Sequence, residues 1–287
     1  MIRQTLACAA ALSALAVTAT AVAAHQDPHA GHAAHGAHGA HDEALRTAIA
    51  ASTRTPANAA RDRYRHPQET LSFFGVKPSD TVVEIWPAGG WYTEILAPYV
   101  AQGGGTYIAA SMGANGHNGV RRLIEANGAL YGGIRTATFP VLDAAETGVP
   151  DGTADVVLTF RNVHNWHTGY QRERQPYAEE AFRQMYRMLR PGGTLGVVDH
   201  RLPESADAAR EQSSGYLKVS TVRRLAEAAG FRYVGASEVN ANPRDTADWP
   251  DGVWTLPPNY RRGDQDRERY AAIGESDRMT LRFVKPE

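Results

Sequence analysis

The sequence has a single cysteine, Cys8, which lies close to the N-terminus. Disulfide bonds therefore have no part in the expected stability of the folded protein. An excess of charge of one sign is also lacking, because 30 Lys and Arg stand against 31 Asp and Glu. No basic stripe that could follow a phosphate backbone is present, so nucleic acid is not an expected partner.

Charge is absent from Leu6–Ala24, a run of small apolar residues that follows Arg3 and ends in an A-x-A-like segment, Ala21–Ala23. A basic start, an apolar centre and such an end predict a signal peptide over residues 1–24. A membrane anchor is the alternative, but a run of about 19 residues is near the lower limit for a membrane span. We therefore expect cleavage, no membrane span afterwards and an exported, periplasmic protein.

Large apolar residues are lacking in residues 25–42, which read HQDPHAGHAAHGAHGAHD. With no apolar face to bury, this segment is predicted to be a flexible tail. Six of the eleven histidines lie in it, namely His25, His29, His32, His35, His38 and His41. Neutral imidazoles bind Zn, Cu or Ni, and a flexible tail can bring several to one ion. The alternative is a soluble linker with weak, unselective metal affinity.

Residues 43–287 are predicted to form one α/β domain, since this length can bury a large core. Helical patterns come first, over Asp42–Ser52 and Ala57–Phe74. The predicted strands are Thr81–Trp86, Thr106–Ala110, Ile134–Phe139, Ala154–Phe160, Thr194–Asp199, Phe231–Val239 and Arg278–Lys285. Further helices are predicted at Trp91–Tyr99, Val120–Asn127, Pro176–Leu189 and Thr221–Ala229. Such alternation implies parallel strands joined by right-handed helical crossovers.

The last two strands do not follow this alternation, because residues 240–277 between them are rich in Trp, Pro and Arg. We interpret this segment as an insertion, which allows the last strand to run antiparallel. The predicted fold is therefore a Rossmann-like, doubly wound sheet of about seven strands. It is mostly parallel with an antiparallel last strand, and helices cover both faces.

The turn after the first predicted strand is the expected ligand site of such a sheet. Here it reads VVEIWPAGGWYTEIL, with an acidic residue, Glu84, near the end of the strand. Gly89 and Gly90 permit close approach of a ligand to the backbone, and the following helix offers unpaired amides to a carboxylate. These features favour a nucleoside-bearing cofactor.

Three further segments carry a family resemblance: DVVLTFRNVHNW, MYRMLRPGGTLGVVDHR and VSTVRRLAEAAGFRYV. Together with the first turn, they resemble class I S-adenosylmethionine (SAM)-dependent methyltransferases over Pro67–Val239. The later DWPDGVWTLPP and GESDRMTLRFVKP resemble an exported branch of predicted methyltransferases. The resemblance implies SAM as cofactor and methyl transfer to a small-molecule acceptor.

Glycine is scarce where that family has most of it. Members show acid-x-G-x-G-x-G in the first loop, whereas this chain has Glu84, Trp86, Ala88 and Gly90 at the corresponding positions. The family lets the methionine part of SAM lie against bare backbone here, and the indole of Trp86 would occupy that space. The resemblance nevertheless assigns these residues and Gly89 to the cofactor.

An acid is also lacking after the second predicted strand, because no Asp or Glu occurs from Tyr107 to Gly119. The family uses that acid to bind the ribose hydroxyls, and Ser111 or Asn115 could substitute with a neutral hydrogen bond. Asp143, after the third strand, could match the acid that contacts the adenine amino group. Asp143 could equally cap a helix.

The segment RNVHNWH follows the fourth predicted strand, where the family places residues that face the methyl group and the substrate. The resemblance therefore assigns Asn162 to the cofactor and His164 and Asn165 to catalysis. His164 has a reference pKa near 6.5 and could act as a general base. The alternative is a histidine that caps a helix or packs beside Trp166.

Asp199 and His200 follow the fifth predicted strand on the same rim of the sheet. They could orient a substrate, or form a metal site of the two-His, one-carboxylate type with His164. Alternatively, Asp199 caps the next turn and His200 faces solvent. The aromatic residues Trp249 and Trp254 could cover the pocket, although we expect them to bury the long insertion.

Two other functions are compatible with parts of the sequence. A NAD(P) dehydrogenase would need G-x-G-x-x-G at the first turn, and the sequence offers only AGG there. The other is a periplasmic protein that binds a small molecule or a metal on a repurposed methyltransferase fold. The preferred hypothesis is an exported SAM-dependent methyltransferase, with the acceptor and the oligomeric state left open.

Overall fold

The computed structural model describes Met1 and residues 41–143 and 146–287. The predicted signal peptide and five of the six tail histidines, His25 to His38, lie outside these residues. His41 is described, and it is the first residue of a helical stretch over residues 41–49.

Seven strands form one sheet in the order β3-β2-β1-β4-β5-β7-β6. They are β1 (Thr81–Ile85), β2 (Thr106–Ser111), β3 (Arg135–Thr138), β4 (Ala154–Phe160), β5 (Leu189–His200), β6 (Arg232–Ser237) and β7 (Arg278–Val284). The first five are parallel to one another, whereas β7 runs antiparallel to both β5 and β6. The structure therefore confirms the predicted doubly wound sheet and its antiparallel last strand.

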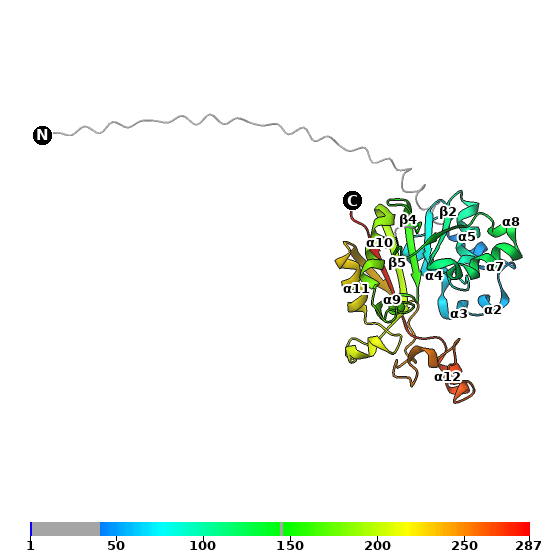
Figure 1. Cartoon of the computed structure of the whole chain (residues 1–287), viewed down its shortest axis with the longest axis vertical. Coiled ribbons are helices and arrows are strands. Elements are labelled where there is room, and N and C mark those ends of the chain that lie inside the picture. The colour runs from blue at the N-terminus through cyan, green and yellow to red at the C-terminus, as the bar shows by residue number, and fades with distance from the viewer. Residues whose placement is uncertain (2–40, 144–145) are drawn as a thin grey trace. The chain divides into compact units, whose positions relative to one another are not determined.

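Helices cover both faces of the sheet, with α10 and α11 on one side and α4, α5 and α7 on the other (Figure 1). The α-helices are α2 (Pro56–Ala59), α3 (Asp62–Arg65), α4 (Pro67–Phe74), α5 (Thr93–Gln102), α6 (Gly113–Gly116), α7 (Asn118–Ala126), α8 (Gly128–Tyr131), α9 (Val163–His167), α10 (Ala178–Met188), α11 (Val219–Ala228) and α12 (Arg267–Ile273). Two 3₁₀ helices, η1 (Ala208–Gln212) and η2 (Gly252–Thr255), lie in the connections after β5 and β6. No helix of the described residues is long and apolar enough to cross a membrane.

The sheet has a hydrophobic core on each face, because side chains alternate between the two faces along each strand. In β1, Val82 belongs to the cluster that contains Phe74 of α4 and Ile95 of α5, whereas Val83 belongs to the cluster with Phe182 of α10. Because successive residues point to opposite faces, each central strand buries side chains on both sides of the sheet.

The single helix predicted over Ala57–Phe74 is wrong, because the structure has α2, α3 and α4 in its place. His66 separates α3 from α4 in a left-handed conformation (φ 40°, ψ 58°), and Pro67 opens α4. A residue before proline disfavours the right-handed helical region, so the chain turns at His66. A second difference is that β5 begins at Leu189, which pairs with Ala154, rather than at Thr194.

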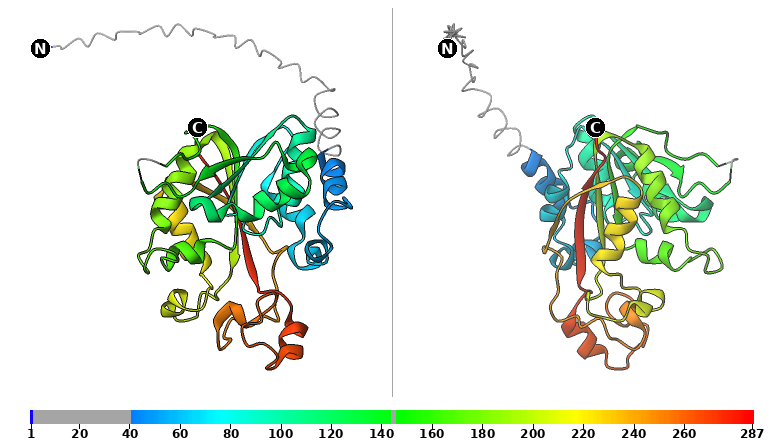
Figure 2. Two further views of the ribbon diagram at one scale, coloured as in Figure 1. Left: turned by 45° about the vertical axis from the view of Figure 1, so that its right-hand side comes forward. Right: turned by 90° about the vertical axis from the view of Figure 1, so that its left-hand side faces the viewer.

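The segment between β6 and β7 contains η2 and α12 and lies at the carboxyl edge of the parallel strands, at the bottom of Figure 2. Since β7 is antiparallel, its first residue reaches the same edge: Arg278 is the register partner of His200, the last residue of β5. Residues from the C-terminal part of the chain therefore join the end of the sheet where a ligand is expected.

Candidate functional site

A cavity of about 770 Å³ lies at the carboxyl ends of β1, β2, β4 and β5. The strand order reverses between β1 and β4, so the cavity occupies the topological switch point of the sheet. Its walls come from the loops after β1, β2 and β4 and from residues 253–259 of the segment before β7. A volume of this size suits a small organic ligand or cofactor.

The loop after β1 has the left-handed backbone that glycine favours, although only one of the family's three loop glycines, Gly90, is present. Trp86, Ala88 and Gly90 have φ angles of 53°, 51° and 86°, all in the left-handed region. This conformation costs a non-glycine residue about 1 kcal/mol. Gly89 faces open space, since a Cβ added to it would meet no atom within 4 Å. The backbone of Gly89 is therefore accessible from the cavity.

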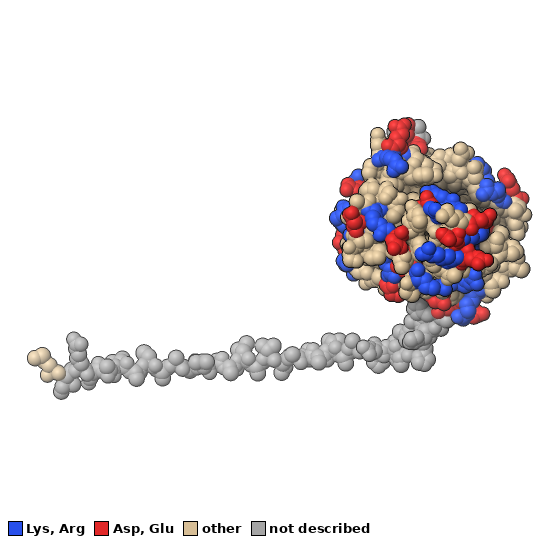
Figure 3. Space-filling view, turned by 90° about the horizontal axis from the view of Figure 1, so that it is seen from below, with Lys and Arg blue, Asp and Glu red and all other residues tan. Residues whose placement is uncertain are grey.

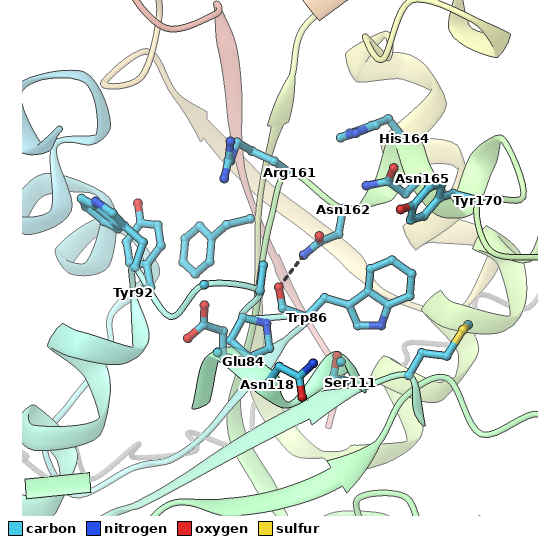
Figure 4. A pocket seen from close by; sticks show the side chains of 18 of the residues that line it. Glu84, Trp86, Tyr92, Ser111, Asn118, Arg161, Asn162, His164, Asn165 and Tyr170 are labelled. Atoms are coloured by element: carbon cyan, nitrogen blue, oxygen red, sulfur yellow. Dashed lines mark hydrogen bonds between the residues drawn. The ribbon is translucent and has the colours of Figure 1, made fainter. Parts of the chain in front are cut away.

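The indole of Trp86 points away from Glu84, toward the end of β3 and α9 (Figure 4). Its Nε1 donates a hydrogen bond to the carbonyl oxygen of Phe139 (2.8 Å). The ring centroid lies 5.9 Å from that of Trp166 and 6.5 Å from that of Tyr177. Trp86 lines the cavity, but its ring packs on the aromatic core rather than over Gly89.

Glu84 lies at the bottom of the cavity and is only 2% exposed. Its Oε2 accepts hydrogen bonds from the hydroxyl of Thr93 (3.2 Å) and from that of Tyr107. Burial raises the pKa of Glu84 to about 7, although these hydrogen bonds act in the opposite direction. The carboxyl group can therefore exchange its proton near neutral pH.

Neutral polar groups surround the end of β2. Ser111, Asn115 and Asn118 line the cavity, and Gly119 packs so closely on the loop after β1 that a Cβ there would lie 1.9 Å from the carbonyl oxygen of Ala88. Asp143 is not among the residues that line this cavity; it is exposed, beside the undescribed residues 144–145. Its predicted contact with adenine stays a prediction.

The side chain of Asn162 ties the ends of two strands together. Its Nδ2 donates to the carbonyl oxygen of Ile85 (2.9 Å) and to Oγ1 of Thr159 (3.1 Å). Asn162 and Asn165 both line the cavity, on the side opposite Ser111 (Figure 4). Asn162 thus fixes the mouth of the site in addition to facing it.

His164, Asp199 and His200 come together in the wall of the cavity, with ligand-type atoms within 4.8 Å of one another. His164 donates from Nδ1 to Oδ1 of Asp199 (2.8 Å) and from its backbone amide to Oδ2 (3.1 Å). The backbone amide of His200 also donates to Oδ1 (2.8 Å). Because Asp199 engages Nδ1, the Nε2 atom of His164 is left for the cavity.

His200 does not face bulk solvent but is buried in the cavity wall, where its Nδ1 lies 2.5 Å from Oγ of Ser276. Burial lowers the pKa of His200 well below its ordinary value, and His164, Arg278 and Arg161 lower it further. Trp254 also lines the cavity, with its ring centroid 6.2 Å from that of His164. By contrast, Trp249 packs within the insertion, against Tyr270.

Four arginines that line the cavity were missed in the sequence: Arg65, Arg122, Arg161 and Arg278. Arg161 immediately follows β4, and Arg278 is the first residue of the antiparallel β7. Both positions lie at the carboxyl edge of the sheet, so strand direction together with residue type was the signal that could have found them. Arg65 belongs to α3 and had no such signal.

Comparison with known proteins agrees with this architecture. Residues 87–197 match the family model described as a methyltransferase domain. The fold is that of a class I methyltransferase. A candidate sarcosine dimethylglycine methyltransferase from Galdieria sulphuraria is 13% identical, with a TM-score of 0.53 over 79% of this chain and 85% of its own.

Two further structures are similar in fold. The SpnF cyclase is 15% identical, with a TM-score of 0.52 over 77% of this chain and 80% of its own. The CurJ carbon methyltransferase is 13% identical, with a TM-score of 0.50 over 86% of this chain and 59% of its own. Comparison with curated proteins finds no match. At such identities the likeness establishes the fold, and the activity must be argued from the site.

Proposed function

We propose that the protein is an exported SAM-dependent methyltransferase that transfers a methyl group to a small molecule. The observation that carries the activity is the cavity over Gly89, at the first turn of a sheet with the class I methyltransferase order. SAM, when bound, supplies a methyl group activated by its sulfonium. Transfer is an in-line displacement, so the protein contributes chiefly by positioning the two reactants.

The chemical groups that line the cavity match those that SAM needs. The backbone at Gly89 is uncovered because the Trp86 ring packs toward Phe139, so the loop can be approached closely. Glu84 offers a carboxylate to the cationic end of the cofactor, and Ser111 with Asn115 offers neutral hydrogen bonds to the ribose hydroxyls. Binding of a cation beside Glu84 would favour its ionised form and so release a proton near neutral pH.

His164 is the candidate general base for an acceptor that must lose a proton. Asp199 holds its imidazole through Nδ1, which leaves Nε2 for the acceptor. This is the arrangement of a histidine oriented by a carboxylate, in which the acid fixes both the ring and its tautomer. His164→Gln is expected to lower kcat, because the amide cannot accept the proton of the acceptor.

Calorimetric titration with SAM and S-adenosylhomocysteine tests the cofactor. Gly89→Val should abolish binding with little effect on the fold, because the added side chain enters the cavity and meets no protein atom within 4 Å at Cβ. Gly133→Val is the matched control, since a Cβ there also meets nothing and Gly133 lies outside the cavity. No binding to the wild type at millimolar ligand, or equal binding by both variants, would remove the cofactor proposal.

A second candidate is a small-molecule protein that uses this fold without methyl transfer. The observation that favours it is Trp86, whose indole occupies the space between the end of β3 and α9. The similar SpnF cyclase is named for a different reaction, so the fold is compatible with other chemistry. The same titration separates the two functions, because this candidate binds neither SAM nor S-adenosylhomocysteine.

Export is proposed from the sequence of residues 1–24 alone. A basic residue, an apolar run and an A-x-A-like end support it. Mass spectrometry of the protein from a cell fractionation tests the proposal. We expect a periplasmic species that begins close to His25, and a full-length cytoplasmic protein would refute it.

A further inference from the structure

Three arginines, two of which line the cavity, share one buried carboxylate. Glu275, which is 3% exposed, accepts hydrogen bonds from Nε of Arg61 (2.6 Å), from Nε of Arg65 (3.3 Å) and from Nη2 of Arg278. Arg65 and Arg278 both line the cavity and are 4% and 2% exposed. Nη2 of Arg65 and Nε of Arg278 have no hydrogen-bond partner among the described residues. One negative charge therefore leaves this cluster positive.

Arg161 adds a further cation to the same wall. It lines the cavity, and its guanidinium forms neither a hydrogen bond nor an ion pair with any residue that the structure describes. Burial lowers its pKa to about 10, and repulsion from Arg278 contributes. Arg161 also has a left-handed backbone (φ 64°), a strain that persists where surrounding structure requires it and is often found at functional sites. Arg161 is half-buried, and a charge that loses part of its hydration without a partner is costly unless a ligand supplies the opposite charge.

The same charges argue against a metal ion beside them. Both oxygens of Asp199 already accept hydrogen bonds, and the positive charges of Arg278 and Arg161 act on the neighbouring His200. A divalent cation would have to enter next to these guanidinium groups. An oxyanion, in contrast, matches the fork of N–H donors that arginine presents.

The face of the molecule seen in Figure 3 does not share this excess of positive charge. On the face shown in Figure 3, Lys and Arg are interspersed with Asp and Glu. The uniform sign of the cations in the cavity wall thus contrasts with the mixed charges of that face. Arg161 precedes His164 by three residues, and Arg278 pairs in register with His200, so the cations lie beside the histidines.

We propose that Arg65, Arg161 and Arg278 bind a dianionic oxyanion group of the methyl acceptor, either a phosphate monoester or a dicarboxylate. The guanidinium groups of Arg61, Arg65 and Arg278 share the carboxylate of Glu275, and Arg161 adds a fourth cation, so a dianionic group offsets the excess of positive charge. The bound anion holds the acceptor next to Nε2 of His164. That the anion belongs to a methyl acceptor rests on the proposed function, whereas the anion site itself does not.

Calorimetric titration of the full-length protein with inorganic phosphate and with succinate tests the site without SAM. Arg161→Gln is expected to lower the affinity for the probe that binds by about tenfold to a hundredfold, as loss of a charge-assisted hydrogen bond implies. Arg122→Gln is the matched control, because Arg122 also lines the cavity but is exposed, and it is expected to change the affinity less than about twofold. Thermal unfolding without ligand checks that both variants fold.

The outcomes separate the anion site from the methyltransferase proposal. Absence of binding by both probes, or equal losses in the two variants, would overturn the anion site whatever SAM does. Competition between the bound probe and SAM would mean that the arginines hold the carboxylate of the cofactor, which also overturns an acceptor site. Independent binding of the probe and SAM supports it, and the tighter of phosphate and succinate identifies the acceptor class.

Discussion

The raised pKa of Glu84 makes the stability of the protein depend on pH in a calculable way. The ordinary pKa of the carboxyl group is 4.5 and its value in the folded protein is about 7. The folded state therefore binds more protons than the unfolded state between these values, and stability falls as pH rises through them. The full loss, above pH 7, is about 3 kcal/mol.

Glu84→Gln removes this dependence because an amide does not titrate, while its oxygen still accepts hydrogen bonds from Thr93 and Tyr107. Relative to wild type, the variant should gain about 2 to 3 kcal/mol in free energy of unfolding between pH 5 and pH 8. Urea unfolding followed by tryptophan fluorescence at both pH values measures the gain. Glu125→Gln, an exposed position in α7, is the control.

The reasoning would be refuted by a difference between Glu84→Gln and wild type that is the same at pH 5 and pH 8. It would also be refuted if Glu125→Gln showed the same gain, because the pH dependence would then come from general charge. Burial of Glu84 is the cause of the pH dependence only if Glu84→Gln shows the gain in free energy of unfolding and Glu125→Gln does not.

Three further outcomes are expected. Trp86→Gly should lower the free energy of unfolding, measured in urea, by about 2 to 4 kcal/mol, because loss of the packed indole outweighs relief of its left-handed backbone. The affinity of the same variant for SAM, measured by calorimetry, should rise because the cavity gains space. Glu275→Gln should cost about 3 to 5 kcal/mol in the same urea assay, since it leaves buried guanidinium groups without their shared carboxylate. Removal of residues 25–41 should reduce the number of zinc ions bound per chain in a metal titration.

Each of these outcomes has its own control. Ala88→Gly changes a residue with φ of 51° and no ring, so it should stabilise the protein by about 1 kcal/mol, opposite in sign to Trp86→Gly. Glu268→Gln, an exposed position in α12, should leave stability within about 0.5 kcal/mol, unlike Glu275→Gln. Equal zinc stoichiometry with and without the tail would mean that its histidines do not bind metal.

The strands were predictable because their signal is local. Buried parallel strands appear as short apolar runs, and β1, β2 and β4 lie within a residue of their predicted bounds. The helix over Ala57–Phe74 was not predictable in detail, because residues compatible with a helix stand on both sides of His66 while the chain turns there. Proline at position 67 was the one local sign of that break.

The site was predictable only in part. Glu84, Gly89 and His164 follow from their places at strand ends, which the order of elements fixes. The direction of the Trp86 ring depends on Phe139 and Trp166, which are distant in sequence, and no local pattern contains it. For the same reason the sequence left open whether His164 and His200 meet, whereas their ring centroids lie 5.1 Å apart.

The cluster around Glu275 joins the two ends of the folded domain, since Arg61 and its carboxylate partner are 214 residues apart in sequence. Such a contact forms only after nearly the whole chain is available, because β7 must insert between β5 and β6 to deliver it. A nascent or C-terminally shortened chain can therefore build most of the sheet and still lack the cavity wall. Ligand binding at this wall would consequently report that synthesis and folding are both complete.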